Sequence, residues 1–147
     1  MRIYLDNCSL QRPLDDQSQL RIKRESTEIV HLLSLFESGS MTLVSSEVLQ
    51  IEIDRISDSE RREASFEILR IAGEIIAVTP AIKELARELG KYGITTFDAL
   101  HLASAETAEV DYFCTTDDKL LKKAKTAQVN LKVKAVSPTE LMEEILK

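Results

Sequence analysis

The sequence predicts an α/β fold with three layers, in which helices cover both faces of a central, mainly parallel five-stranded sheet. Five short apolar segments alternate with amphipathic stretches, and short polar turns join them. This alternation is typical of parallel sheets, because their crossover helices pack on the two faces. A chain of 147 residues fits one domain with a core of its own. We therefore expect residues 1–147 to form a single domain.

The predicted strands are apolar runs that end near turn or capping residues. In chain order they are residues 2–5, 41–44, 75–78, 112–115 and 132–136. Apolar residues at helical spacing predict helices over about 19–37, 80–90 and 97–109. Capping residues predict further helices that begin near Ser45 or Ser46, Ser57-Asp58-Ser59, Asp117-Asp118 and Ser137. Residues 9–18 are expected to form a polar loop.

Composition is that of a soluble globular protein. Hydrophobic residues make up 44% of the chain and charged residues 30%, which excludes a disordered chain. No apolar stretch approaches the roughly 20 residues that span a bilayer. The N-terminal residues show no signal-peptide pattern. We therefore expect a cytoplasmic protein with no membrane partner.

The cysteines and histidines do not predict a soft-metal site. Cys8 and Cys114 form no CxxC pair and no disulfide framework. We expect both thiols to be reduced and largely buried. No spacing among these cysteines, His31 and His101 matches a zinc site. His31 lies among apolar helical residues and is expected to be structural.

Four acidic residues lie where strands and helices can deliver them to one edge of the predicted sheet. Asp6 ends the first strand and Asp117 follows the fourth, while Glu52 and Asp98 lie in helices. Ligands of open α/β sheets bind beyond the carboxyl ends of strands. Like charges that meet in one pocket require raised pKa values or a bound cation. Oxygen ligands favour Mg²⁺ or Mn²⁺, so converging carboxylates would predict a metal site for phosphate-ester chemistry.

Each of these acids also has a simpler interpretation. A single aspartate at a strand end or helix start is commonly a cap or turn residue. Glu47 competes with Glu52 for a place in the acidic set, and Asp118 competes with Asp117. Only the position of all the side chains in the fold distinguishes a shared site from separate caps.

The helix near residue 97 carries Asp98-Ala99-Leu100-His101-Leu102-Ala103-Ser104-Ala105. It resembles the Asp-Ala-x-His-x-Ala-x-Ala helix of PIN-domain ribonucleases, a family that includes the toxins of many prokaryotic toxin–antitoxin pairs. Three further segments agree in order and spacing: the strand ending at Asp6, residues 46–52, and Thr115-Thr116-Asp117. The resemblance extends from residue 2 to about residue 136.

The resemblance implies an endoribonuclease that hydrolyses RNA phosphodiester bonds with Mg²⁺ or Mn²⁺. Its acidic site would consist of Asp6, Glu52, Asp98 and Asp117. We expect Asp6 and Asp98 to be the primary metal ligands, with the other two as second ligands or water-orienting bases. Family members also form homodimers, and the toxins bind an antitoxin protein. A net charge of −6 is unusual for an RNA-binding protein, although a cation would offset part of it.

The sequence departs from the family pattern two residues after the first aspartate. The family usually has Ser, Thr or Asn there, whereas this chain has Cys8, so Asn7 or Ser9 is expected to order the site. The other candidate contacts to substrate or partner are Arg12, Arg21, His101, Lys119 and Lys122. In the alternative, the arginines pair with Asp15, Asp16 or Glu25, the lysines form a solvated face, and His101 is a packing residue.

Two other classes of function compete with the nuclease. One is a PIN-like module that binds RNA or a partner protein without cleaving RNA. The other is a phosphohydrolase with an aspartyl nucleophile, or a phosphoacceptor receiver. The phosphohydrolase typically needs a second aspartate where this chain has Cys8. A receiver needs paired acids and a late lysine that the sequence does not place.

Overall fold

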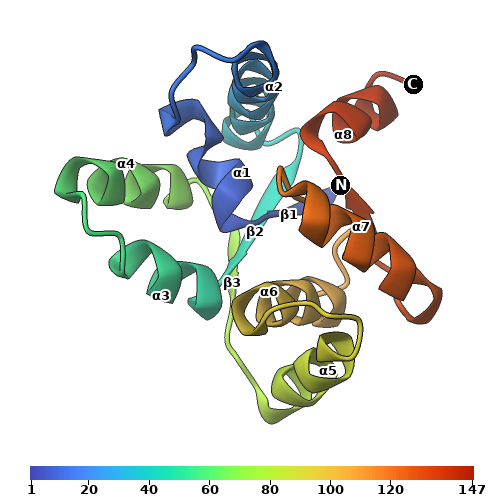
Figure 1. Cartoon of the computed structure of the whole chain (residues 1–147). Coiled ribbons are helices and arrows are strands. Elements are labelled where there is room, and N and C mark those ends of the chain that lie inside the picture. Colours follow the sequence, from blue (N-terminus) through green and yellow to red (C-terminus); the bar gives the residue numbers. More distant parts are fainter.

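Strand β1 (Arg2–Leu5) lies at the centre of a five-stranded sheet with the order β3-β2-β1-β4-β5 (Figure 1). This is a computed structural model that describes residues 1–147. Each pair of neighbouring strands is parallel. The remaining strands are β2 (Thr42–Ser46), β3 (Glu74–Ile76), β4 (Tyr112–Cys114) and β5 (Lys134–Val136). The predicted five-stranded α/β fold is confirmed, and its sheet is entirely parallel.

Eight α-helices connect or follow the strands. They are α1 (Asn7–Gln11), α2 (Leu20–Glu37), α3 (Glu47–Asp54), α4 (Ser59–Leu69), α5 (Pro80–Gly90), α6 (Thr96–Thr107), α7 (Asp118–Ala127) and α8 (Pro138–Ile145). Short 3₁₀ turns, η1 (Arg12–Leu14) and η2 (Gln128–Asn130), follow α1 and α7. None of the helices combines the length and hydropathy that a membrane span needs.

Local sequence explains where several helices begin and end. The side chains of Ser46 and Asp58 accept hydrogen bonds from backbone N–H groups in the first turns of α3 and α4. Ser137 and Glu140 form a reciprocal capping box at the start of α8. Gly39 follows α2 with φ +82°, a conformation that glycine adopts without strain.

Alternating side chains of the central strand separate two layers of core. Ile3 and Leu5 pack with residues of α2 and α8 on one face. Tyr4 points to the opposite face, where its cluster contains residues of α5, α6 and α7. Figure 1 shows α2 and α8 at the top of the view and α5 and α6 at the bottom. Each fully buried large side chain contributes about 1.5–3 kcal/mol, so both layers stabilise the sheet substantially.

Small residues bring α6 close to the sheet. Ala99, Ala103 and Ala105 are all buried within the core that α6 shares with Tyr4 and Phe113. The short side chains let the helix backbone approach the strands closely. Helix α6 therefore presents its N-terminal turn, with Asp98, beside the carboxyl ends of the strands.

The structure corrects three expectations. The predicted polar loop over residues 9–18 is wrong in its first part, because α1 begins at Asn7 and η1 follows it. A five-residue helix is too short to show a period, but Leu10 is fully buried against Leu49 and Ile53. Cys114 is buried as expected, whereas Cys8 is exposed. His31 is exposed on α2 and is not a core residue.

Candidate active site

The carboxyl edge of the sheet has a position where the chain reverses its direction of winding. Strand β1 is followed by β2 on one side, and the chain returns to place β4 on the other side. The β1–β4 pair is joined beyond the strands as well, since the Asp6 N–H donates to the Cys114 carbonyl at 3.2 Å. Ligands of open α/β sheets bind at such a reversal. Asp6 and Asp117 follow these two strands.

Asp6 is almost completely buried, with 2% of its surface exposed. Its Oδ1 accepts a hydrogen bond from the Ser9 N–H at 2.9 Å, and its Oδ2 accepts one from Thr115 Oγ1 at 2.6 Å. Burial nevertheless raises the pKa of Asp6 to about 6, because desolvation outweighs these two hydrogen bonds. The fold therefore holds a carboxylate whose charge is only partly compensated.

Ser9, and not Cys8, orders the end of β1. Its backbone N–H binds Asp6, and its hydroxyl donates to the Cys114 carbonyl at 3.1 Å. Ser9 is fully buried, so it joins β1 to β4 and does not reach a substrate. Asn7 lies at the surface of α1 and accepts a hydrogen bond from Gln11 Nε2 at 2.5 Å. Of the two expected replacements, Ser9 makes the ordering contacts.

Asp98 lies in the first turn of α6 and is half-buried. Thr95 Oγ1 donates to its Oδ2 at 3.0 Å. Burial raises the pKa of Asp98, and the nearby charges of Glu52 and Asp117 raise it further. Burial is the main cause of this shift, and the charges of the other two acids add to it.

Glu52 projects from α3 with 22% of its side chain exposed. Its Oε1 is hydrogen-bonded to His101 Nε2. His101 is 1% exposed, and its Nδ1 is hydrogen-bonded to the Tyr4 hydroxyl at 2.5 Å. His101 is thus a buried, hydrogen-bonded residue, as the packing interpretation describes. Glu47, the rival of Glu52, instead accepts a hydrogen bond from the Val78 N–H.

Asp117 caps α7 and is linked to Asp6 through Thr115. Its Oδ1 accepts from the N–H groups of Lys119 and Leu120 at 2.9 and 3.1 Å. Its own N–H donates to Thr115 Oγ1 at 3.0 Å, and that hydroxyl donates to Asp6. Asp117 therefore caps α7 through one Oδ atom, which leaves its other Oδ atom available to a shared site.

The pKa of the Cys8 thiol is affected by all four carboxylates. Desolvation and the charges of all four acids raise its pKa to about 12; the four are Asp6, Asp117, Asp98 and Glu52. All four carboxylates therefore lie near this thiol. No three His, Cys, Asp or Glu side chains lie close enough to hold a metal ion together. The structure gathers the acids around Cys8 without bringing them into a ligating cluster.

The two predicted arginine contacts are engaged in ion pairs. Arg12 contacts Asp15 at 3.1 Å and Glu25 at 3.0 Å. Arg21 binds Asp118 through two hydrogen bonds of 2.7 and 2.8 Å, which lower the pKa of that carboxyl. The ion-pair interpretation holds for both, although no contact to Asp16 forms. Lys119 and Lys122 are exposed on α7, as a solvated face requires.

A hollow of about 340 Å³ lies beside Asp117. Its polar lining includes Asn7, Gln11, Arg12, Arg61, Thr116 and Asp117. Arg61 comes from α4 and donates to Gln11 Oε1 and to the Leu14 carbonyl, and it forms an ion pair with Asp15. No sequence pattern indicated Arg61, because it is one of several charged residues in a polar helix.

The PIN domain family model matches residues 13–126. The chain belongs to the PIN domain family. Members are typically nucleases and generally use divalent metal ions. The matched segment contains Glu52, Asp98 and Asp117, and Asp6 lies shortly before it. The family and the fold predicted from the sequence are both confirmed.

Two solved structures share the fold. One is VapBC2 from Rickettsia felis, solved with a DNA fragment from its promoter. It is 16% identical to this chain with a TM-score of 0.59, and the match covers 93% of this chain and 98% of that chain. PAE2754 from Pyrobaculum aerophilum is 14% identical with a TM-score of 0.54, over 99% of this chain and 90% of that chain. No curated protein matches the sequence.

Proposed function

We propose that this PIN-domain protein is a metal-dependent endoribonuclease that uses Mg²⁺ or Mn²⁺ to hydrolyse RNA phosphodiester bonds. The observation that carries the proposal is the gathering of four acids around Cys8 at the reversal point of the sheet. Two of these acids, Asp6 and Asp98, have raised pKa values. Acids whose charge is left uncompensated at a ligand-binding edge are typical of functional sites.

The donor set fits a hard divalent cation. Asp6, Glu52, Asp98 and Asp117 offer carboxylate oxygens, which Mg²⁺ and Mn²⁺ prefer. Cys8 and Cys114 are soft donors near them, and a raised pKa keeps each of these residues a thiol. Positive charge at this point would also relieve the repulsion that raises the pKa of Asp98. We assign Asp6 and Asp98 as primary ligands, with Glu52 and Asp117 as outer ligands.

The chain's own residues would fix the acids and orient the attacking water. A divalent ion supplies a water of lowered pKa and neutralises charge on the phosphate. Thr115 and Ser9 hold both oxygens of Asp6 at defined positions. Asp117 is fixed through one oxygen only, so its other oxygen can accept a hydrogen bond from a water. No side chain has to form a covalent intermediate.

RNA phosphates would approach from the hollow beside Asp117. Arg12 and Arg61 line this hollow, and guanidinium groups suit phosphate oxygens. Lys119 and Lys122 lie on the exposed surface of α7, which begins beside the same acid. These residues supply positive charge beside the acids in a chain whose net charge is −6.

The proposal includes partners. We infer that the protein acts as the toxin of a toxin–antitoxin pair in the cytoplasm, that it forms a homodimer, and that an antitoxin protein binds it. The family and the fold shared with VapBC2 support this inference. Co-expression with the product of a neighbouring small gene, followed by size-exclusion chromatography, would test the antitoxin. Sedimentation of the protein alone would test the homodimer.

Replacing Asp98 tests the proposed activity. Asp98→Asn keeps an oxygen that can accept the Thr95 hydrogen bond but removes the charge. We expect Mn²⁺-dependent cleavage of a generic RNA to fall by more than about 100-fold, because a direct ligand outweighs an outer-shell residue. Asp54→Asn is the matched control, since Asp54 is exposed on α3 and outside the acidic set.

The same assay separates the nuclease from a binding module. Cleavage that persists in Asp98→Asn, or that ignores chelation by EDTA, would contradict the proposed mechanism. RNA left intact by the wild type at high protein and Mn²⁺ concentrations would support a PIN-like protein that binds RNA or a partner without cleaving RNA.

A further inference from the structure

A buried chain of hydrogen bonds ends on Glu52. The Ser46 hydroxyl lies 2.6 Å from the Tyr4 hydroxyl, which lies 2.5 Å from His101 Nδ1. His101 Nε2 is hydrogen-bonded to Glu52 Oε1. Ser46, Tyr4 and His101 are each at most 1% exposed, whereas Glu52 opens toward the site with 22% of its side chain exposed. The chain therefore connects the interior of the core to one acid of the candidate site.

Counting donors and acceptors assigns a direction to this chain. Ser46 Oγ accepts from the Leu49 N–H, and its own proton can bind the Tyr4 oxygen. Tyr4 then donates its proton to His101 Nδ1, and burial raises the pKa of Tyr4 so that this proton stays in place. A neutral His101 then carries its ring proton on Nε2 and donates it to Glu52. Every donor in the chain points toward the carboxylate.

The same chain joins the three elements that carry Asp6, Glu52 and Asp98. Tyr4 lies on β1, two residues before Asp6. Ser46 caps α3, the helix that carries Glu52. His101 lies on α6, one turn after Asp98. A shift of any one of these elements would break a hydrogen bond of the chain, so the chain fixes their relative positions.

The rings in this chain also pack as core residues. The Tyr4 ring stacks on Phe113 with centroids 5.7 Å apart, and it lies 5.7 Å from the His101 ring. Packing alone does not require that His101 donate to a partly exposed acid, because apolar rings would fill the same space. A buried polar chain that ends at the candidate site is suited to orienting the acid at its end.

We propose that Tyr4 and His101 are positioning residues that hold Glu52 in one orientation for the metal site, with His101 as the direct contact. This role rests on the proposed function, because it matters only if Glu52 contributes to cation binding. A carboxylate ligand that is fixed in advance loses less freedom when the ion binds. Loss of the Nε2 donor would leave α3 in place but let the Glu52 side chain rotate.

Nuclear magnetic resonance of the metal-free protein tests this chain of hydrogen bonds directly. We expect ¹⁵N shifts of His101 that show a proton on Nε2 and none on Nδ1. Tyr4→Phe should change the Nδ1 shift of His101, because it removes the only donor to that atom. Tyr112→Phe is the control, since the Tyr112 hydroxyl contacts Glu144 and not His101. A proton found on Nδ1 would overturn the assigned direction and the proposal with it.

Two substitutions of His101 separate positioning from packing. His101→Gln can place an amide donor near the position of Nε2, whereas His101→Asn reaches only the position of Nδ1. Both are smaller and polar, so a structural role would weaken folding similarly in both. We expect Mn²⁺ affinity, measured by calorimetry, to fall about 10- to 100-fold in His101→Asn and clearly less in His101→Gln. His31→Gln, at an exposed histidine, should bind Mn²⁺ as the wild type does.

Kinetics and thermal unfolding complete the test. We expect kcat to fall more than KM changes in His101→Asn, because RNA binding does not involve Glu52. Equal Mn²⁺ affinity in wild type and a folded His101→Asn would overturn the positioning role and leave the proposed function intact. Should His101→Asn fail to fold, unchanged Mn²⁺ affinity in Tyr4→Phe together with an unchanged His101 spectrum would overturn it. A wild type that binds no Mn²⁺ would overturn both proposals.

Discussion

Acidic residues at the two ends of the sheet differ in whether a cation balances their charge. At the amino end, Glu74 binds Arg2 through two hydrogen bonds of 2.7 and 2.8 Å, which lower the pKa of Glu74. Asp111 at that end accepts the Arg2 N–H at 2.8 Å. At the carboxyl end, the pKa values of Asp6 and Asp98 are raised, and none of the ion pairs includes either residue. Glu74 is thus compensated by a cation, whereas Asp6 and Asp98 at the candidate site are not.

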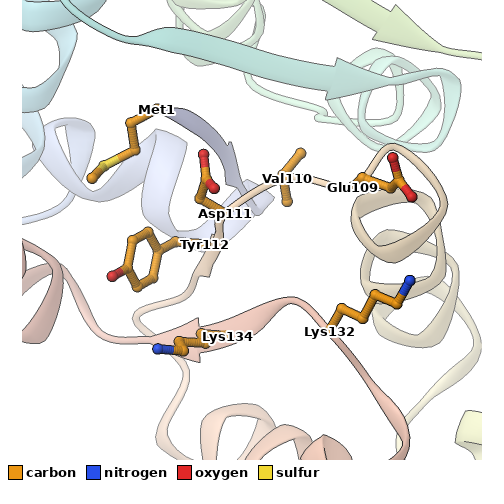
Figure 2. Close-up of a pocket in the computed structure, with 7 residues that line it drawn as sticks. All are labelled: Met1, Glu109, Val110, Asp111, Tyr112, Lys132 and Lys134. Carbon is orange, nitrogen blue, oxygen red and sulfur yellow. The ribbon is translucent and has the colours of Figure 1, made fainter.

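The size of a hollow does not mark the site. The amino end has a hollow of about 580 Å³, larger than the one beside Asp117 (Figure 2). Figure 2 shows Asp111, Glu109, Lys132 and Lys134 spread around its rim, with no set of acids that converges. Its lining carries charges of both signs, and nearby Arg2 binds the carbonyls of Ala108 and Glu109. The raised pKa values of Asp6 and Asp98 distinguish the candidate site from the amino end, whereas the volume of the hollow does not.

The largest expected effect comes from exchanging one acid for its amide at each end. Asp6→Asn should lower Mn²⁺ affinity by more than about 100-fold, since it removes a proposed direct ligand. Asp111→Asn should leave Mn²⁺ affinity unchanged, because the amide oxygen can still accept the Arg2 N–H. Calorimetric titration of both variants with MnCl₂ measures the difference. Similar affinities in the two variants would end the distinction between the two ends.

Much of the fold could be predicted because periodicity and capping are local properties. The apolar runs at residues 2–5 and 112–115 matched β1 and β4 to within one residue. Helix α1 was missed because five residues cover little more than one turn, too few to show a period. The exposure of Cys8 and His31 was also missed. Each depends on how a helix turns relative to the rest of the fold, which neighbouring residues do not specify.

The candidate site was predicted in part, for a related reason. The acids could be named because each follows a strand or lies in a helix with a recognisable motif. Arg61 could not, because its contacts with Gln11 and Asp15 join segments that are far apart in the chain. The partners of His101 were hidden too, since Tyr4 and Glu52 reach it from a strand and from another helix. Long-range contacts of this kind appear only in the folded structure.

The opposite pKa shifts predict opposite effects on stability in the metal-free protein. The Asp6 pKa is raised from 3.8 to about 6, so its contribution to stability is present below 3.8 and is lost as pH rises through about 6. Asp6→Asn should therefore stabilise the protein at pH 7.5 by up to about 2–3 kcal/mol, with little effect at pH 4. Urea unfolding in EDTA at both pH values measures this.

Replacing Glu74 should change the stability in the opposite direction in the same experiment. Its pKa is lowered, so it stabilises the protein above its unfolded pKa, and this stability is lost as pH falls through the folded value. Glu74→Gln should thus destabilise the protein slightly at pH 7.5, since the ion pair with Arg2 is largely solvated. Destabilisation by Asp6→Asn at pH 7.5 would show that its hydrogen bonds outweigh the burial of its charge.

The smallest expected effect is a loss of RNA affinity that should occur at one hollow and not at the other. Arg61→Gln removes a charge beside Asp117, and Lys132→Gln removes one at the amino end. In an Asp98→Asn background that does not cleave RNA, we expect Arg61→Gln to weaken binding of single-stranded RNA about 3- to 10-fold and to reduce the salt slope by about 0.7. Lys132→Gln should change neither. Fluorescence anisotropy at several KCl concentrations provides the measurement.

Arg61→Lys separates the charge from the contacts of Arg61 within the fold. Lysine keeps the positive charge but cannot reproduce the fork that binds Gln11, Leu14 and Asp15. We expect its salt slope to match that of the parent while its thermal stability falls, as in Arg61→Gln. If Arg61→Lys and Arg61→Gln lost RNA affinity equally, the effect would come from a displaced α4. The hollow beside Asp117 would then have no direct part in binding phosphate, and the carboxyl end would differ from the amino end in its acids alone.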